Sequence, residues 1–402
     1  MALKIDKGLI KGSLILLIAY NLYNLLNFFF HFAMVRFLSV VEYGILASLY
    51  SIIYILAVFT EAIQTVIIKY TTKEQNKGKL KNIIKKLFKK SFFISGFLFI
   101  SHLLISIPLS FFLEINYYLM AVNGLMIFLA FFTPITRGIL QGRKKFKALG
   151  INMIVEAVAK LSLALIFIFI GWTVYGAIIG TLIGVLIAFS LSFISLLDVT
   201  KSKEEKSDTQ GIYNYTKPAF IIIMIIFLFF SIDVIIAKIF FPADIAGAYA
   251  ISSILAKTIF FGTQPISRAM FPLSAENDSS KKSENIFSNA LFILCFVILA
   301  ALILFYLFPT LIIKIFSGKI IVESISILFY VGIAISLLSL TNLILLYKLS
   351  LGKVKGYQYL SIFILIEIIL LSIFSSDLLQ FSIAFITASA IFLWASIFLM
   401  ND

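Results

Sequence analysis

The sequence predicts an all-α protein that crosses a membrane about twelve times. Of its 402 residues, 61% are hydrophobic and only 13% are charged, and the mean hydropathy is +1.09. The apolar residues occur in long runs, and roughly 20 such residues are enough for a helix to span the hydrocarbon core. The charges fall mostly on alternate connections between the runs. These observations exclude a soluble globular fold and predict a polytopic membrane protein.

Twelve runs have the length of a membrane-spanning helix. They cover approximately residues 12–36, 43–68, 91–113, 116–137, 149–171, 173–197, 217–240, 244–270, 287–313, 321–346, 357–375 and 378–400. The first run is too long for the apolar part of a signal peptide and is not followed by a cleavage site of small residues. We therefore expect it to be a permanent transmembrane helix.

The charges on the connections predict the orientation. Basic residues concentrate in connections 69–90, 138–148, 198–216, 271–286 and 347–356. Because Lys and Arg accumulate on the cytoplasmic side, we expect a multi-pass protein of the cytoplasmic membrane with both termini in the cytoplasm. The formal net charge of +14 is thus a topology signal, and no nucleic-acid partner is expected. A single cysteine, Cys295, excludes a disulfide or thiolate metal framework. No metal or other cofactor is predicted.

Two six-helix halves are predicted, because the polar stretch Lys201–Gln210 divides the runs evenly. We expect an N-terminal lobe at 1–200, a cytoplasmic linker at 201–216 and a C-terminal lobe at 217–402. Residues 36–44 resemble residues 238–247, and each stretch joins the first two runs of its half. Since six is an even number, the halves have the same orientation. This parallel repeat predicts a substrate site between the lobes, near the membrane midplane.

Residues 79–90 form a basic amphipathic segment. Leu80, Ile83, Ile84 and Leu87 fall on one helical face, and six lysines cover much of the rest. This pattern is typical of an interfacial helix that lies on anionic membrane lipids. Membrane anchoring and the gathering of an anionic lipid headgroup both explain it.

Polar residues inside the runs are the candidate site residues, since a charge at a helix centre costs about 2.5–3.5 kcal/mol and normally faces a bundle interior or water. The candidates for a substrate cavity are Asn24, Asn27, His31, Glu61, Glu156, Lys160 and Lys257. They lie on polar stripes of four different runs, which favours a water-filled cavity. The alternative is that they only hydrogen-bond one helix to another.

Individual charges suggest individual roles. Lys160 and Lys257 lie roughly 16–20 Å deep at 1.5 Å per residue, where cations could stabilise a diphosphate. Lys160 is also one turn from Glu156, so the two could neutralise each other. Asp233 has no partner on its own helix. It could bind a coupling H⁺ or Na⁺, or it could pair with the first or eighth span.

Two arginines follow prolines near predicted cytoplasmic ends, in Pro134–Arg137 and Pro265–Arg268. Proline removes a helical hydrogen bond and kinks a helix. Arg137 and Arg268 are therefore candidates for a gate, or for side chains that reach the lipid headgroups.

Two motifs carry a resemblance to a known family. Residues 36–46, RFLSVVEYGIL, and residues 137–142, RGILQG, followed by Phe146, resemble signatures of Wzx-type polysaccharide flippases. That family is part of the multidrug/oligosaccharidyl-lipid/polysaccharide exporter (MOP) superfamily. The resemblance implies two lobes around a V-shaped central cavity and alternating access. It also implies transfer of a polyprenyl-pyrophosphate-linked oligosaccharide to the outer leaflet. The family often carries Arg where this chain has Lys160, which keeps the charge but loses the bidentate fork.

Two other classes of function compete with a lipid-linked oligosaccharide flippase. An ion-coupled exporter of cationic drugs could share the fold, but it needs a cavity dominated by carboxylates. Lys160 and Lys257 favour an anionic substrate instead. A membrane component of a glycan-synthesis complex is disfavoured, because the sequence has no large outer connection and no catalytic motif. We therefore predict a transporter and not an enzyme.

Overall fold

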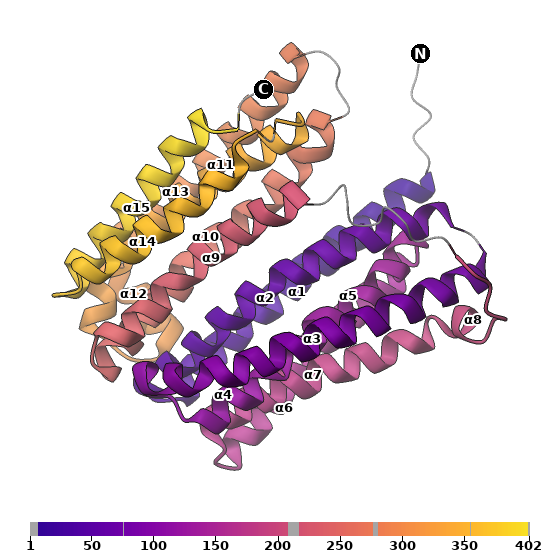
Figure 1. Ribbon diagram of the computed structural model, residues 1–402. Coiled ribbons are helices and arrows are strands. Elements are labelled where there is room, and N and C mark those ends of the chain that lie inside the picture. Colours follow the sequence, from indigo (N-terminus) through magenta and orange to yellow (C-terminus); the bar gives the residue numbers. More distant parts are fainter. Residues whose placement is uncertain (1–6, 75, 208–216, 276–279, 354, 401–402) are drawn as a thin grey trace. The chain divides into compact units, whose positions relative to one another are not determined.

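Helices account for all regular structure in the described part of the chain (Figure 1). The structure is a computed structural model, and it describes residues 7–74, 76–207, 217–275, 280–353 and 355–400. Much of the predicted linker, residues 208–216, lies outside these ranges.

The helices follow the predicted runs. The first half of the chain forms α1 (Lys7–Phe37), α2 (Val40–Lys73), α3 (Lys77–Leu113), α4 (Tyr117–Gly124), α5 (Met126–Gly142), α6 (Phe146–Phe169), α7 (Thr173–Ile194) and α8 (Leu197–Thr200). The second half forms α9 (Lys217–Phe240), α10 (Ala243–Ala275), α11 (Ser280–Leu307), α12 (Pro309–Ser317), α13 (Val322–Ser350), the 3₁₀ helix η1 (Tyr357–Ser361), α14 (Ile362–Ile373) and α15 (Leu378–Phe398).

Ten helical stretches among the described residues are long and apolar enough to cross a membrane, and α4 with α5 counts as one of them. Helix α1 and the shorter apolar stretch Tyr357–Ile373 occupy the first and eleventh predicted spans. The prediction of an all-α membrane protein with about twelve spans is confirmed.

The chain packs into two compact units. The N-terminal unit comprises Met1–Met34 and Leu56–Lys217, and the C-terminal unit comprises Val35–Ile55 and Pro218–Asp402. The segment Val35–Ile55, which comprises the end of α1, the short turn after it and the first half of α2, therefore packs with the C-terminal unit.

A close approach of two glycines explains where this segment belongs. Gly44 of α2 lies so near Gly247 of α10 that a Cβ on Gly44 would be 2.8 Å from the Gly247 Cα. These glycines end the two similar stretches of the predicted repeat. Nearby, the Arg36 side chain donates to the Phe316 carbonyl at 3.3 Å, and the Tyr54 ring packs on Phe230. Only a residue without a side chain permits this backbone contact.

The apolar face of the basic segment 79–90 is part of the hydrophobic core of the N-terminal unit. Leu80, Ile83, Ile84 and Leu87 are buried against α5, α6 and α8, and α3 runs without a break from Lys77 to Leu113. The prediction that residues 79–90 form an interfacial helix with its apolar face on lipid is therefore wrong. Its apolar face packs on protein and not on lipid, because Ile135, Ile139 and Leu149 cover it.

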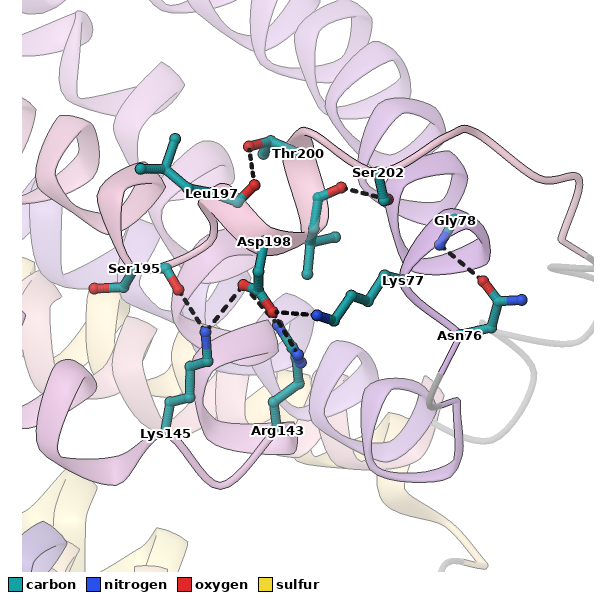
Figure 2. Close-up of polar contacts among 11 residues, drawn as sticks. Asn76, Lys77, Gly78, Arg143, Lys145, Ser195, Leu197, Asp198, Thr200 and Ser202 are labelled. Carbon is teal, nitrogen blue, oxygen red and sulfur yellow. Dashed lines mark hydrogen bonds and ion pairs between the residues drawn. The ribbon is translucent and has the colours of Figure 1, made fainter.

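Asp198 joins three basic connections at one end of the N-terminal unit (Figure 2). Its carboxylate accepts hydrogen bonds from Arg143 at 3.1 and 2.8 Å and from Lys145 at 3.1 Å. The Lys77 Nζ lies 3.5 Å from the Oδ2 atom of this carboxylate. Chiefly because of the hydrogen bonds from Arg143, and then those from Lys145, the pKa of Asp198 lies well below its usual value. The connections predicted to share one side of the membrane thus meet here.

We predict that Gly44→Ala lowers the melting temperature of the purified protein by several degrees. The added methyl group would overlap the α10 backbone, and overpacking typically costs about 1–3 kcal/mol. Gly262→Ala is the matched control, because a Cβ there meets no atom within 4 Å. It should be neutral or slightly stabilising, since Ala is the better helix former. Equal effects of the two substitutions would contradict the close contact.

We also predict that Asp198→Asn lowers the melting temperature at pH 7 by about 2 °C, since a partly exposed ion pair contributes roughly 1 kcal/mol or less. The pKa of this group is depressed in the folded protein, so its stabilisation is complete above the unfolded pKa of about 4. It is lost as the pH falls toward the folded pKa. The difference between wild type and variant should therefore shrink below about pH 4. Substitution of the exposed Glu284 by Gln is the control, and a difference that persists at low pH would contradict the pairing.

Candidate functional site

Six side chains, four of them buried and two half-buried, form a polar group in the N-terminal unit, which we call the N-terminal cluster. Its members are Tyr23 and Asn27 from α1, Arg137 from α5, and Asn152, Glu156 and Lys160 from α6. The three α6 residues are spaced one turn apart, so they share a helical face. Helix α7 packs closely against this part of α6. A Cβ added to Gly184 of α7 would lie 2.6 Å from the backbone nitrogen of Lys160.

Glu156 is the centre of the N-terminal cluster. One carboxylate oxygen accepts from Arg137 at 2.7 Å, and the other accepts from the Tyr23 hydroxyl at 2.7 Å. The Arg137 Nε donates to the Asn152 amide oxygen at 2.9 Å. The side chains of Arg137 and Glu156 are only 10% and 7% exposed, so their charges compensate each other away from water.

Lys160 is held differently. Its ammonium group donates to the Asn27 amide oxygen at 2.7 Å and lies over the Phe30 ring, 4.2 Å from the centroid. The amide of Asn27 in turn donates to the Tyr23 carbonyl at 2.9 Å. The side chains of the cluster thus bring two positive charges, on Arg137 and Lys160, and one negative charge, on Glu156.

These contacts refine one interpretation of the sequence and correct another. Glu156 is hydrogen-bonded to Arg137, and it also interacts electrostatically with Lys160, one turn along its own helix. Arg137 is buried in the N-terminal unit, so it does not reach out to lipid headgroups. The physical reason is that the planar guanidinium of Arg137 can contact both Glu156 and Asn152, whereas a lysine offers a point charge.

A second group, the C-terminal cluster, consists of Asp233 on α9 and Tyr249, Ser253 and Lys257 on α10. Lys257 donates to one Asp233 oxygen at 2.9 Å, and the other oxygen accepts from Ser253 at 2.6 Å and Tyr249 at 3.1 Å. The exposed fractions of Lys257 and Asp233 are 1% and 0%. Asp233 therefore has the partner in the eighth span that was one of its two predicted alternatives. Its role in ion coupling stays a prediction.

Glu367 on α14 adds another carboxyl group to the C-terminal unit. It is fully buried, and neither of its carboxyl oxygens has a hydrogen-bond partner within the described ranges. It interacts electrostatically with Asp233 and Lys257. An ionised carboxylate in such surroundings is costly unless it is paired or binds a cation.

The remaining predicted site residues are outside both clusters. Asn24 is exposed on α1, Glu61 is half-buried on α2, and Arg268 is exposed on α10. His31 is buried and packs edge-on against Phe30. Asn24 is three residues from Asn27 on the same side of α1, so polar groups continue from the exposed surface to the buried Lys160.

Tyr23 and Asn152 are not among the predicted site residues, although Asn152 shares the polar helical face of Glu156 and Lys160. Tyr23 is four residues before Asn27, and Asn152 is four residues before Glu156. The helical spacing therefore placed both beside a predicted site residue. Their hydrogen bonds to Glu156 and Arg137 depend on three helices meeting, which no spacing along one helix predicts.

The two clusters differ in what they can bind. The excess of positive charge in the N-terminal cluster suits an anion, for which Lys160 is a mobile donor. The C-terminal cluster and Glu367 together hold two carboxyl groups and one ammonium group, which suits a cation or a proton. No group of three or more His, Cys, Asp or Glu side chains in the described residues could hold a metal ion.

Comparison with proteins of known structure places the fold. The chain resembles a multidrug resistance transporter of the MATE family, within the MOP superfamily, in its inward-facing conformation. The TM-score is 0.77 at 14% identity, over 94% of each chain. It also resembles the lipid II flippase MurJ in an inward closed conformation, with a TM-score of 0.71 at 16% identity, over 97% of this chain and 87% of that one. At this identity the likeness establishes the two-lobed fold alone.

Sequence comparison gives the family. An uncharacterized membrane protein of Methanocaldococcus jannaschii, MJ1375, is 26% identical over 313 residues, which are 72% of this chain and 74% of that protein. The model of a family described as "polysaccharide biosynthesis protein" matches residues 33–326. This match covers most of the chain and includes both predicted motifs, so the chain belongs to that family of polysaccharide biosynthesis proteins.

Proposed function

We propose that the chain is a flippase that moves a polyprenyl-diphosphate-linked oligosaccharide across the cytoplasmic membrane by alternating access. Membership in a polysaccharide biosynthesis family and the fold shared with a lipid II flippase support this proposal. In this reading the termini are cytoplasmic, and the substrate moves from the inner leaflet to the outer leaflet.

The observation that carries the proposal is the excess of positive charge in the N-terminal cluster. A diphosphate that crosses the hydrocarbon core loses its water, and this loss is prohibitive unless cations compensate it. Arg137 is engaged by Glu156, whereas Lys160 donates to the neutral amide of Asn27. An anion can replace that amide as the acceptor without leaving a carboxylate unpaired.

The arrangement of α1 suggests how the anion reaches Lys160. Asn24 is exposed, Asn27 is half-buried and Lys160 is buried, so the polarity extends inward along one side of α1. A headgroup can exchange hydrogen bonds with these amides before it meets the ammonium group. Because a lysine is a flexible point charge, it can release the headgroup again when the conformation changes.

An ion-coupled exporter of drugs remains the alternative, and one observation favours it. The C-terminal cluster and Glu367 bring two buried carboxyl groups together, which is the type of site that exchanges cations. Such a site is equally compatible with a flippase that a cation gradient drives. It therefore discriminates between the two functions less well than the charge of the N-terminal cluster does.

We predict that Lys160→Gln reduces export of lipid-linked oligosaccharide at least tenfold at matched protein level. The glutamine amide can still donate to Asn27, so the substitution removes the charge and spares the hydrogen bond. Lys160→Arg should keep part of the activity, because it keeps the charge. Export can be measured as translocation of a fluorescent lipid-linked glycan in vesicles.

The C-terminal pair provides the comparison for this test. Lys257→Ala alone leaves Asp233 buried and unpaired, which typically costs about 3–5 kcal/mol, so a loss of export would reflect folding. The double variant Asp233→Asn/Lys257→Gln removes both charges together. If Lys257 also contacts the substrate, the double variant folds but loses export.

Normal export by Lys160→Gln would refute the proposed role of the N-terminal cluster.

A further inference from the structure

A groove of about 590 Å³ opens at the end of the N-terminal unit where α6 begins and α7 ends. Its walls come from α1, from the turn between α5 and α6, from the first turns of α6 and from the last residues of α7. All of these belong to one unit. Figure 2 shows two of its residues, Lys145 and Ser195, beside the Asp198 ion pairs.

The groove joins two kinds of surface. At the turn, Lys144, Lys145 and Lys147 line it. Further along, its lining is mostly aliphatic and includes Ile15, Ile151, Val155 and Leu191, beside the polar Asn152. Within α6, Phe146 and Val155 are nine residues apart, which is a rise of about 14 Å at 1.5 Å per residue. Helix α6 is long and apolar enough to span a membrane, and this rise is close to half of the ~30 Å hydrocarbon core, so the groove runs from one end of that span toward its middle.

Two of the lysines are available to a ligand. Lys145 is already engaged, because its ammonium group donates to the Ser195 carbonyl at 2.7 Å and to Asp198. Lys144 and Lys147 are exposed, and the side chain of neither makes a hydrogen bond or ion pair with another described residue. Asp198 cannot neutralise them, since Arg143, Lys145 and Lys77 already surround its single carboxylate.

The backbone at Lys144 has a conformation that glycine would adopt more readily. Its φ angle is 57°, in the left-handed region, where a side chain is disfavoured. The chain nevertheless carries a lysine at this position, beside the groove. Replacement of Lys144 by glycine should therefore preserve the turn while it removes the charge. The substitution thus tests the charge separately from the backbone conformation.

We propose that this groove binds one anionic phospholipid. Lys144 and Lys147 hold the phosphate, and an acyl chain lies along Ile15, Ile151 and Leu191. Opposite charge favours the phosphate, and the aliphatic lining favours a chain over a soluble anion. The site differs from the transport path, because it lies at headgroup depth inside a single unit. Its ligand has no need to cross the membrane, so the inference does not depend on the proposed flippase activity.

The groove also borders the N-terminal cluster. Asn152 lines it, and the amide oxygen of Asn152 accepts the hydrogen bond from Arg137 at 2.9 Å. A bound lipid would therefore pack beside the residue that positions Arg137 against Glu156.

Native mass spectrometry of the full chain tests the proposal, with dioleoylphosphatidylglycerol and dioleoylphosphatidylcholine as probes that share the same acyl chains. Wild type should retain one phosphatidylglycerol in preference to phosphatidylcholine. Lys144→Gly/Lys147→Gln should weaken that retention about tenfold or more. The control Lys281→Gln/Lys282→Gln removes the same charge from exposed positions at the start of α11, and it should retain the lipid as wild type does.

Further arms separate a lipid from other anions. Ile151→Ser changes a side chain that is 52% exposed, and it should weaken phosphatidylglycerol retention severalfold. Displacement of the lipid by millimolar inorganic phosphate would overturn the proposal in favour of a free-anion site. Retention of a polyprenyl phosphate but not of phosphatidylglycerol would overturn it in favour of the lipid carrier. Unchanged retention by the Lys144/Lys147 double variant would also overturn it.

Discussion

The cost of burying an ionised side chain in a membrane-spanning helix governs the arrangement of the polar residues in this chain. An isolated charge in such a place costs several kcal/mol, and a compensating partner removes most of that cost. In each unit, a buried cation and a buried carboxylate on neighbouring helices meet this requirement. Arg137 pairs with Glu156, and Lys257 pairs with Asp233. Both partners of each pair belong to the same unit.

This local neutralisation has a consequence for the proposed transport. Alternating access requires the lobes to change their relation to each other while each keeps its internal packing. Charge pairs that are complete within one unit do not have to break in such a change. Lys160 is the distinctive member of the N-terminal cluster, because the acceptor of its hydrogen bond is a neutral amide. In the proposed transport, an anionic headgroup would take the place of that amide while Arg137 and Glu156 stay paired.

Much of the fold could be predicted from the sequence, because run length and the alternation of charge follow directly from the thickness of the bilayer and the side on which lysines accumulate. Part of the site could be predicted by the same reasoning, since a charge inside an apolar run is costly wherever it lies. The ion pairs between these side chains could not be predicted from the sequence. Asp233 and Lys257 are 24 residues apart, and Arg137 and Glu156 are 19 apart on different helices, so only tertiary packing brings them together.

One prediction failed because helical periodicity identifies an apolar face but does not say what covers it. The face of Leu80 and Leu87 was assigned to lipid although protein packs on it. The division of the chain into lobes at residue 200 stays a prediction. In the structure, Val35–Ile55 packs with the C-terminal unit, where Gly44 lies against Gly247.

A pair of double-mutant cycles on the free energy of unfolding, measured in mixed micelles, tests most directly whether each unit neutralises its own charges. The first cycle combines Asp233→Asn with Lys257→Gln, and the second combines Glu156→Gln with Lys257→Gln. The account predicts a coupling energy of about 1–3 kcal/mol within the C-terminal pair and additivity within about 0.5 kcal/mol between residues of different units. Additive effects of Asp233→Asn and Lys257→Gln, or strong coupling between Glu156 and Lys257, would contradict it.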